Sequence, residues 1–179
     1  ISASTLTLTP NANWNGVANI TAYASDGSLK DSTTFTLTVT AINDAPVITA
    51  VSNESTNEET EKSIVLSASD VDGDVLTYSA SSDTSAVTTT VSTNTLKLTP
   101  ALNYIGTSVI TVIVSDNALT DTSKFDFKVI NVNDAPVITA VANDTTSEGS
   151  DGKALKLSAS DIDGDALTYS AFSDTTGLT

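Results

Sequence analysis

The chain contains no cysteine, histidine, methionine or arginine among its 179 residues. Without cysteine, disulfides, thiolate metal sites and thiol nucleophiles are excluded, and without histidine, imidazole bases and imidazole metal ligands are excluded too. The lack of arginine removes the guanidinium groups that commonly clamp phosphates and charged transition states. Catalysis would have to rely on carboxylates, hydroxyls, tyrosine and lysine. We therefore do not expect an enzyme.

Positive charge is also scarce. Seven lysines stand against 22 acidic residues, which gives a net charge of -15 and an isoelectric point of about 4.1. Because such a chain has no basic stripe, nucleic acid is not expected as a partner, and anionic lipid surfaces would repel it. Apolar runs are short, and none approaches the roughly 18 residues that a membrane span needs. We therefore expect no insertion into a membrane.

The sequence repeats itself. Residues 43–51 (NDAPVITAV) return unchanged as residues 133–141, and residues 67–74 (SASDVDGD) return with one conservative change as residues 158–165. A fixed period of this length is the signature of a tandem array. The repeat predicts the following parts: the C-terminal half of one repeat at 1–43, a complete repeat at 44–133, and the N-terminal half of the next at 134–179.

The two ends of the chain are complementary in this alignment. Thr179 aligns with Thr88, and Ile1 aligns with Val91, so the end of the sequence leads into its own beginning after a short gap. Either the copies are continuous within a longer chain, or separate subunits join head-to-tail by strand complementation. The continuous reading is favoured because the gap falls within a predicted strand.

The hydrophobic pattern is that of β-strands. Phe125, Phe127 and Val129 alternate with Asp126 and Lys128, and no stretch shows a helical stripe. Residues 108–115 are apolar on both faces, which predicts a central strand. Turn residues separate seven predicted strands in the complete repeat, at 47–51, 62–68, 75–80, 86–91, 95–99, 108–115 and 123–130. Seven short strands in a repeat of this size predict an all-β fold, with tandem immunoglobulin-like sandwiches in a linear rod.

Two aromatic residues occupy the same place in successive repeats. Tyr104 lies just before the sixth predicted strand, and Trp14 holds the matching position earlier in the chain. A plug resembling the tyrosine corner of β-sandwiches is the favoured interpretation. The alternative is an exposed aromatic that stacks on a ligand, which would make the chain a carbohydrate- or ligand-binding accessory module. Trp14 is the best candidate for such a site.

Acidic residues gather around the repeat boundaries. The second and third strands of a sandwich turn at one pole, where the sixth strand also ends, so the carboxylates placed there should converge beside the Asn-Asp linker. Clustered carboxylates repel one another unless a cation neutralises them, and Ca²⁺ takes 6–8 oxygen ligands of this kind. Ordinary Asp-Gly turn chemistry is the alternative. The metal interpretation is favoured because several acidic elements recur at fixed places around a boundary. The candidate metal ligands are Asn43, Asp44, Glu58, Glu59, Asp70, Asp72, Asp74, Asp116, Asn133, Asp134, Asp161, Asp163 and Asp165.

These motifs resemble those of cadherin repeats. Residues 133–136 (NDAP) resemble the end of the cadherin linker, and residues 68–78 (ASDVDGDVLTY) resemble the Asp-x-Asp segment that leads into the third strand. Residues 112–116 (VIVSD) resemble the segment whose Asp is a calcium ligand there, and Glu58 resembles the early ligand Glu. Over its whole length the chain is most similar to the bacterial cadherin-like tandem repeats of large secreted surface and adhesin proteins.

The resemblance implies calcium at both boundaries. Near residue 133 it assigns as ligands Glu58 or Glu59, Asn133, Asp134, Asp161, Asp163 and Asp165. Near residue 43 it assigns Asn43, Asp44, Asp70, Asp72, Asp74 and Asp116. The chain departs from the cadherin pattern in its linker, which opens with Ala41 and Asn131 instead of Asp, and it lacks the Asp-Arg-Glu motif. These departures imply fewer or weaker calcium ions at each boundary than in cadherins.

The expected function is structural. We expect a calcium-stiffened repeat segment of a secreted extracellular adhesin or fibre, with a spacer and cell-adhesion role. Its partners would be neighbouring repeats or copies of itself, head-to-tail, together with a cell-surface or matrix component. A filament subunit assembled by strand complementation and a carbohydrate-binding module are the alternatives.

Overall fold

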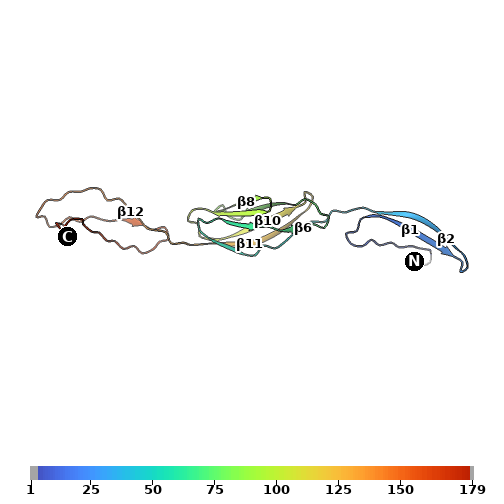
Figure 1. Ribbon diagram of the computed structural model, residues 1–179. Coiled ribbons are helices and arrows are strands. Elements are labelled where there is room, and N and C mark those ends of the chain that lie inside the picture. The colour runs from blue at the N-terminus through green and yellow to red at the C-terminus, as the bar shows by residue number, and fades with distance from the viewer. Residues whose placement is uncertain (1–3, 178–179) are drawn as a thin grey trace.

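The computed structural model describes residues 4–177, which form strands and loops with no helix among them. The chain is elongated, and its two ends lie far apart on opposite sides of a central sandwich (Figure 1). We refer to residues 4–43 as the N-terminal half-unit, to 44–133 as the central unit and to 134–177 as the C-terminal half-unit. The predicted all-β, immunoglobulin-like fold is confirmed. The predicted alignment of the two chain ends, at Ile1 and Thr179, lies outside the described residues.

One sheet of the central unit has the strand order β4-β11-β10-β7. Its strands are β4 (Glu54–Asn57), β7 (Thr77–Ser82), β10 (Gly106–Ser115) and β11 (Thr120–Ile130). β10 pairs antiparallel with both β11 and β7, so the segment that is apolar on both faces is central, as predicted. β4 lies at the edge and pairs parallel with β11.

The opposite sheet has the strand order β5-β9-β8, and β3 and β6 form a separate short antiparallel pair. The bounds of these strands are β3 (Val47–Ile48), β5 (Lys62–Val65), β6 (Ala68–Ser69), β8 (Val87–Ser92) and β9 (Thr95–Pro100). Along β9 the burial alternates with period two, so that Leu96 and Leu98 face inward while Lys97 faces solvent.

The first predicted strand, at 47–51, is shorter than expected because the chain crosses between the sheets there. The N–H of Ile48 donates to the carboxylate of Asp121 (2.9 Å), and the N–H of Val51 donates to the hydroxyl of Ser123 (3.3 Å). Side chains of β11 therefore replace ladder carbonyls until the chain joins the other sheet as β4. The predicted strand 62–68 is likewise divided, since Leu66 exchanges its backbone hydrogen bonds with Asn94 (2.7 and 3.1 Å).

The core lies between the two sheets. Its buried apolar residues are Ile48, Leu66, Val87, Leu96, Leu98, Ile110, Val112, Val114, Phe125, Phe127 and Val129. Both halves of the repeat contribute to this set, so neither half can bury its apolar face alone.

Tyr104 packs against the core, as the plug interpretation predicts, and its hydroxyl lies 3.2 Å from that of Ser108. The ring lies over Gly106, where a Cβ would come within 2.9 Å of the tyrosine oxygen. Glycine is therefore required at the start of β10 for this close approach.

The half-units contain fewer paired strands than the central unit. The N-terminal half-unit contains the antiparallel hairpin of β1 (Gly16–Ser25) and β2 (Lys30–Val39). The C-terminal half-unit contains only one short antiparallel pair, formed by β12 (Val137–Ile138) and β13 (Ala159–Ser160). Within residues 4–177, no helix has the length and apolar character needed to cross a membrane.

Candidate metal centre

The turn at residues 70–74 orders three carboxylates. One oxygen of Asp70, Oδ1, accepts the N–H groups of Asp72 (2.9 Å) and Gly73 (3.1 Å), and Gly73 has a φ of +80°, in the left-handed region that favours glycine. Carboxylate oxygens of Asp70, Asp72 and Asp74 lie within 4.8 Å of one another. The second oxygen of Asp70, Oδ2, is buried and has no hydrogen-bond partner among the described residues. A buried acceptor in this state is rare in folded proteins and fits a position for a cation.

The linker before the central unit lies against this turn. The N–H of Asp44 donates to Oδ2 of Asp72 (2.8 Å), and the side-chain amide of Asn43 donates to Oδ2 of Asp116 (2.7 Å). These two bonds attach consecutive linker residues to two different loops of the central unit. The structure therefore brings the linker and both loops together, as the repeat pattern predicts.

Asp116 is buried at the end of β10. Its Oδ1 accepts the N–H groups of Leu119 (2.6 Å) and Ala118 (2.7 Å). The hydrogen bond from Leu119, followed by those from Asn43 and Ala118, lowers the pKa of this carboxyl below its ordinary value. Asp116 is therefore held as a charged carboxylate beside the linker.

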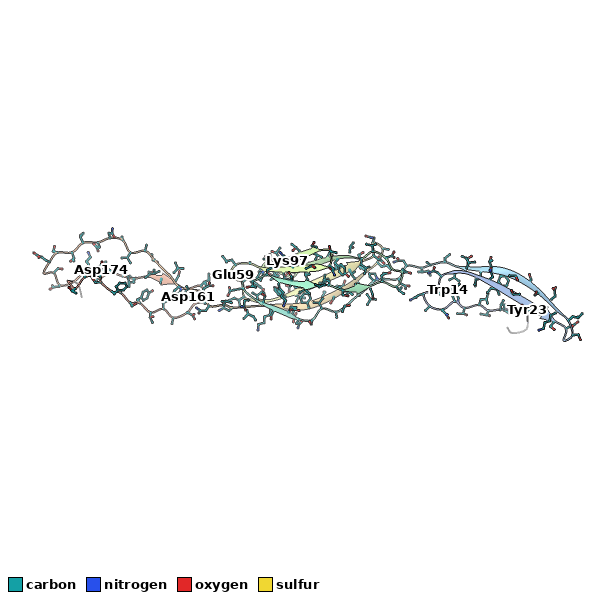
Figure 2. All side chains as sticks on the ribbon, in the orientation of Figure 1. Trp14, Tyr23, Glu59, Lys97, Asp161 and Asp174 are labelled. Atoms are coloured by element: carbon teal, nitrogen blue, oxygen red, sulfur yellow. The ribbon has the colours of Figure 1, made fainter. Side chains whose placement is uncertain are left out.

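At the far end of the central unit, a second acidic group includes residues from both sides of the boundary. Glu58 is buried, its Oε1 accepts the N–H of Val132 (2.7 Å), and its own N–H donates to the carbonyl of Ile130 (2.9 Å). Carboxylate oxygens of Glu58, Glu59 and Asp134 lie within 4.8 Å of one another. In Figure 2, Glu59 lies at the end of the central sandwich and Asp161 lies beyond the linker.

Asp134 also contacts the next unit. Its N–H donates to Oδ2 of Asp163 (2.6 Å), which repeats the bond from Asp44 to Asp72 at the first boundary. Carboxylate oxygens of Asp161, Asp163 and Asp165 lie within 4.8 Å of one another, and Oδ1 of Asp161 accepts the N–H of Asp163 (3.0 Å). Asp134 therefore links the acidic group of the central unit to that of the C-terminal half-unit.

The two boundaries hold different parts of one pattern. In the described chain, the Asn43–Asp116 contact belongs to the first boundary alone, and the glutamate pair belongs to the second boundary alone. Asn133 donates to the carbonyl of Asp134 (3.1 Å), as Asn43 does to that of Asp44 (3.2 Å). The predicted ligands of each boundary thus lie near one another, and their role toward a metal remains a prediction.

Asp121, for which no role was predicted, binds the segment that follows the first linker. It accepts the N–H of Ile48, and this bond, with a second from Thr122, lowers its pKa. The available signal was its recurrence as Asp31 in the preceding half-unit. An isolated aspartate in an alternating strand gives no other indication of such a bond.

The fold defines a class of proteins built from immunoglobulin-like sandwich repeats. Residues 43–128 match the family model described as "Bacterial Ig domain". The match spans nearly all of the central unit, which is therefore similar to a bacterial Ig domain. Domains of this class are typically not enzymes. No curated protein matches the chain.

Several solved structures resemble the chain. Human protocadherin-24 EC1-2 is 30% identical over 56% of this chain and 50% of that chain, with a TM-score of 0.43. Drosophila N-cadherin EC1-3 is 13% identical over 67% of this chain and 44% of that chain, also with a TM-score of 0.43. The endo-fucoidan hydrolase MfFcnA4 of glycoside hydrolase family 107 is 20% identical over 69% of this chain, with a TM-score of 0.39. The chain spans only 20% of the length of that hydrolase.

Proposed function

We propose that this chain is a calcium-stiffened structural repeat segment of a secreted extracellular adhesin or fibre. The observation that carries the proposal is the position of Asp134. Its carboxylate lies within 4.8 Å of those of Glu58 and Glu59, while its N–H bonds to Asp163 in the next unit. Acidic groups of two successive units thus meet at one linker residue.

The donor set fits Ca²⁺. It consists of carboxylates and linker amide and carbonyl oxygens, which hard cations prefer, and it includes the buried Oδ2 of Asp70 that has no protein partner. At the first boundary the ion would be held by Asp70, Asp72, Asp74 and Asp116 with the linker residues. At the second it would be held by Glu58, Glu59, Asp134, Asp161, Asp163 and Asp165, with Asn133 beside them.

The ion would act by removing repulsion. Two like unit charges 4 Å apart repel by about 1 kcal/mol in bulk water and by about 4 kcal/mol in the less polarisable surroundings of a protein surface. In each turn of three aspartates, one carboxylate oxygen of each residue lies within 4.8 Å of the others, so repulsion of this order acts within the turn. A divalent ion converts this repulsion into attraction between the linker and the loops on both sides, and so fixes the angle between successive sandwiches.

Small-angle scattering of the full chain tests this role. We expect a longer maximum dimension and a narrower distribution of shapes in calcium than in chelator. Asp72→Asn and Asp163→Asn, which alter one boundary each, should reduce the difference. Asp126→Asn is the matched control, because this aspartate lies midway along β11, away from both boundaries. Scattering curves that are identical in calcium and in chelator would remove calcium from the proposal.

The extracellular location and the adhesive role are parts of the same proposal. A bacterial Ig domain in a strongly acidic chain with recurrent units is suited to an extended spacer outside the cell, where Ca²⁺ is abundant. Surface labelling of intact producing cells tests the location. Labelling only after lysis would contradict it.

A carbohydrate-binding role is the second candidate. Trp14 is partly exposed and lines a hollow with Asn13, Asp44 and Asp72, a mixture of aromatic and polar groups that suits a sugar. The structural role is preferred because Tyr104, its repeat counterpart, packs on the core. A glycan array probed with the wild-type chain and with Trp14→Ala distinguishes the two, since only a binding site gives a signal that the substitution abolishes.

A further inference from the structure

The loop between β9 and β10 contains an asparagine in the left-handed conformation, and the same residue recurs one repeat earlier. Asn103 has a φ of +53°, and its counterpart Asn13 has a φ of +60°. Both loops are closed by the same backbone hydrogen bond, from the residue after the asparagine to the residue two before it (3.1 Å and 3.3 Å). The two asparagines therefore occupy one structural position in successive units.

Each asparagine faces the unit that follows it. Asn103 borders a hollow together with the linker and with Asp161, which begins the acidic turn of the C-terminal half-unit. Asn13 borders the hollow of the first boundary together with the linker and with Asp72 of the central unit. Figure 2 shows Asp161 at the end of the C-terminal half-unit that faces the central unit. A loop of one unit thus meets the acidic turn of the next unit at both boundaries.

The left-handed conformation alone does not account for asparagine at this position. Glycine adopts that conformation readily, and the repeat exchanges the two residues in the turn that follows β10, where Asn117 (φ +80°) has Gly27 (φ +98°) as its counterpart. The N–H of each donates to the hydroxyl of the serine two residues earlier, at 3.1 Å in both turns. At positions 13 and 103, by contrast, the amide side chain is present in both units although the residues on either side of it differ.

The two amides are available for a contact across the boundary. Within the described residues, the side-chain amides of Asn43 and Asn133 each donate a hydrogen bond, whereas those of Asn13 and Asn103 donate none. The hollow beside Asn103 offers a carboxylate as partner, since Asp161 uses one oxygen, Oδ1, for the N–H groups of its own turn. A hydrogen bond from an amide to a carboxylate is strengthened by the charge of the acceptor.

We propose that Asn13 and Asn103 fasten each unit to the next by donating their side-chain amides to the carboxylates of the following acidic turn, without an ion. This inference deepens the structural role proposed above and rests on that role, but it does not rest on calcium. The contact matters most when no cation is bound, because the clustered carboxylates then repel one another and any acidic neighbour. Asn13 and Asn103 are positioning residues that restrict the angle between successive units.

The absence of cysteine permits a direct measurement at the second boundary. Ser67→Cys and Ser158→Cys introduce two spin-label sites at equivalent, exposed positions of successive units. The carbonyls of these residues accept the N–H groups of Thr49 and Thr139, both at 2.8 Å, so each label is attached to ordered backbone. Double electron–electron resonance of the full chain gives the distribution of distances across the boundary, in chelator and in calcium. We refer to this doubly labelled chain as the parent chain.

Three variants of the parent chain separate the amide from its backbone conformation. Asn103→Gly removes the amide and keeps a residue suited to the left-handed φ, and in chelator we expect it to broaden the distribution. Asn103→Asp replaces the donor with a charge beside Asp161 and should broaden the distribution further. Asn117→Gly is the matched control, because it removes an amide at a left-handed position outside the second boundary and should leave the distribution unchanged. Circular dichroism confirms that the central unit is folded in each variant.

The first boundary provides an independent repetition. Ser32→Cys, at an exposed position of β2, is combined with Ser67→Cys in the central unit. Asn13→Gly should broaden this distribution in chelator as Asn103→Gly does at the second boundary.

Two results would overturn the inference. One is a distribution for Asn103→Gly that is as narrow as that of the parent chain in chelator, and the other is a distribution for Asn103→Asp that is no broader than that of Asn103→Gly. The measurement in calcium tests the proposed function separately. If calcium leaves the parent distribution unchanged while Asn103→Gly broadens it, the role of calcium fails and the asparagine contact stands. If calcium narrows the parent distribution while Asn103→Gly matches the parent chain in both buffers, calcium stands and the asparagine contact fails.

Discussion

The amide of Asn43 lies 2.7 Å from the carboxylate of Asp116, a residue 73 positions later in the chain. This bond joins the linker to the end of the central strand β10, and it recurs in no other pair within residues 4–177. It marks the end of the central unit where the linker enters and where the acidic residues of the first boundary lie.

Lowering the pH should destabilise the folded state at this end of the central unit. The pKa of Asp116 is lowered in the folded chain, chiefly by the Leu119 N–H and then by Asn43, so the unfolded state binds the proton more readily. The stabilisation is present above the unfolded pKa of about 3.9 and is lost as the pH falls through the lower folded value. We expect the urea midpoint to fall between pH 5 and pH 2, and to fall less for Asp116→Asn. The same pH profile in both proteins would contradict the assignment.

Calcium should raise the thermal midpoint. An ion that binds only the folded state, at 100 times its dissociation constant, stabilises that state by about 2.7 kcal/mol. For Asp134→Asn we expect a smaller shift, because Asp134 joins both acidic groups of the second boundary. Asp126→Asn should respond as the wild type does. Scanning calorimetry in calcium and in chelator makes the comparison, and equal shifts for Asp134→Asn and the wild type would exclude this ligand.

Substitutions in the core should destabilise the central unit, whereas substitutions at the corresponding positions of a half-unit should not. Phe127 is fully buried, and Phe127→Ala should lower the free energy of unfolding by about 3–5 kcal/mol. Leu37, its counterpart, lies outside the central core. Leu37→Ala should therefore leave the central unfolding transition unchanged. Urea unfolding followed by circular dichroism measures both, and a comparable loss from Leu37→Ala would show that the half-unit is part of the same cooperative core.

Gly106 should tolerate no side chain. Its φ is +156°, and an added Cβ would lie 2.9 Å from the hydroxyl of Tyr104, which is itself packed on the core. We expect Gly106→Ala to cost about 1–3 kcal/mol by overpacking. Gly73→Ala is the comparison, because no atom lies within 4 Å of its added Cβ and only the left-handed φ of +80° opposes it. If Gly106→Ala is no more destabilising than Gly73→Ala, the contact with Tyr104 is not the cause.

Much of the fold could be predicted from alternation alone. The long strands β10 and β11 occur where apolar residues recur every second position, and each extends by a few residues beyond the predicted range. β4 was missed because Glu54–Asn57 is entirely polar, so an edge strand without an inward apolar face leaves no hydrophobic pattern. Its position is determined by pairing with β11, which is a tertiary property.

The candidate site was predictable to the extent that the repeat places acids at fixed positions. The repeat pattern could not show which carboxylate oxygens already accept hydrogen bonds from their own turn. Oδ1 of Asp70 is used by its own turn while Oδ2 is left without a partner, and this distinction depends on side-chain rotation. The bond from Ile48 to Asp121 was equally inaccessible, because it depends on where the chain crosses between sheets.

The parallel alignment of β4 with β11 determines how the sandwich carries a load. The chain reaches β4 from the first linker by way of β3, and it leaves the central unit just after β11, so tension on the two linkers draws β4 and β11 in opposite directions along their common ladder. The four paired positions, Glu54 to Asn57 against Phe127 to Ile130, are then strained together in shear and cannot be peeled apart one by one. The central unit can thus resist traction between its two linkers without a disulfide.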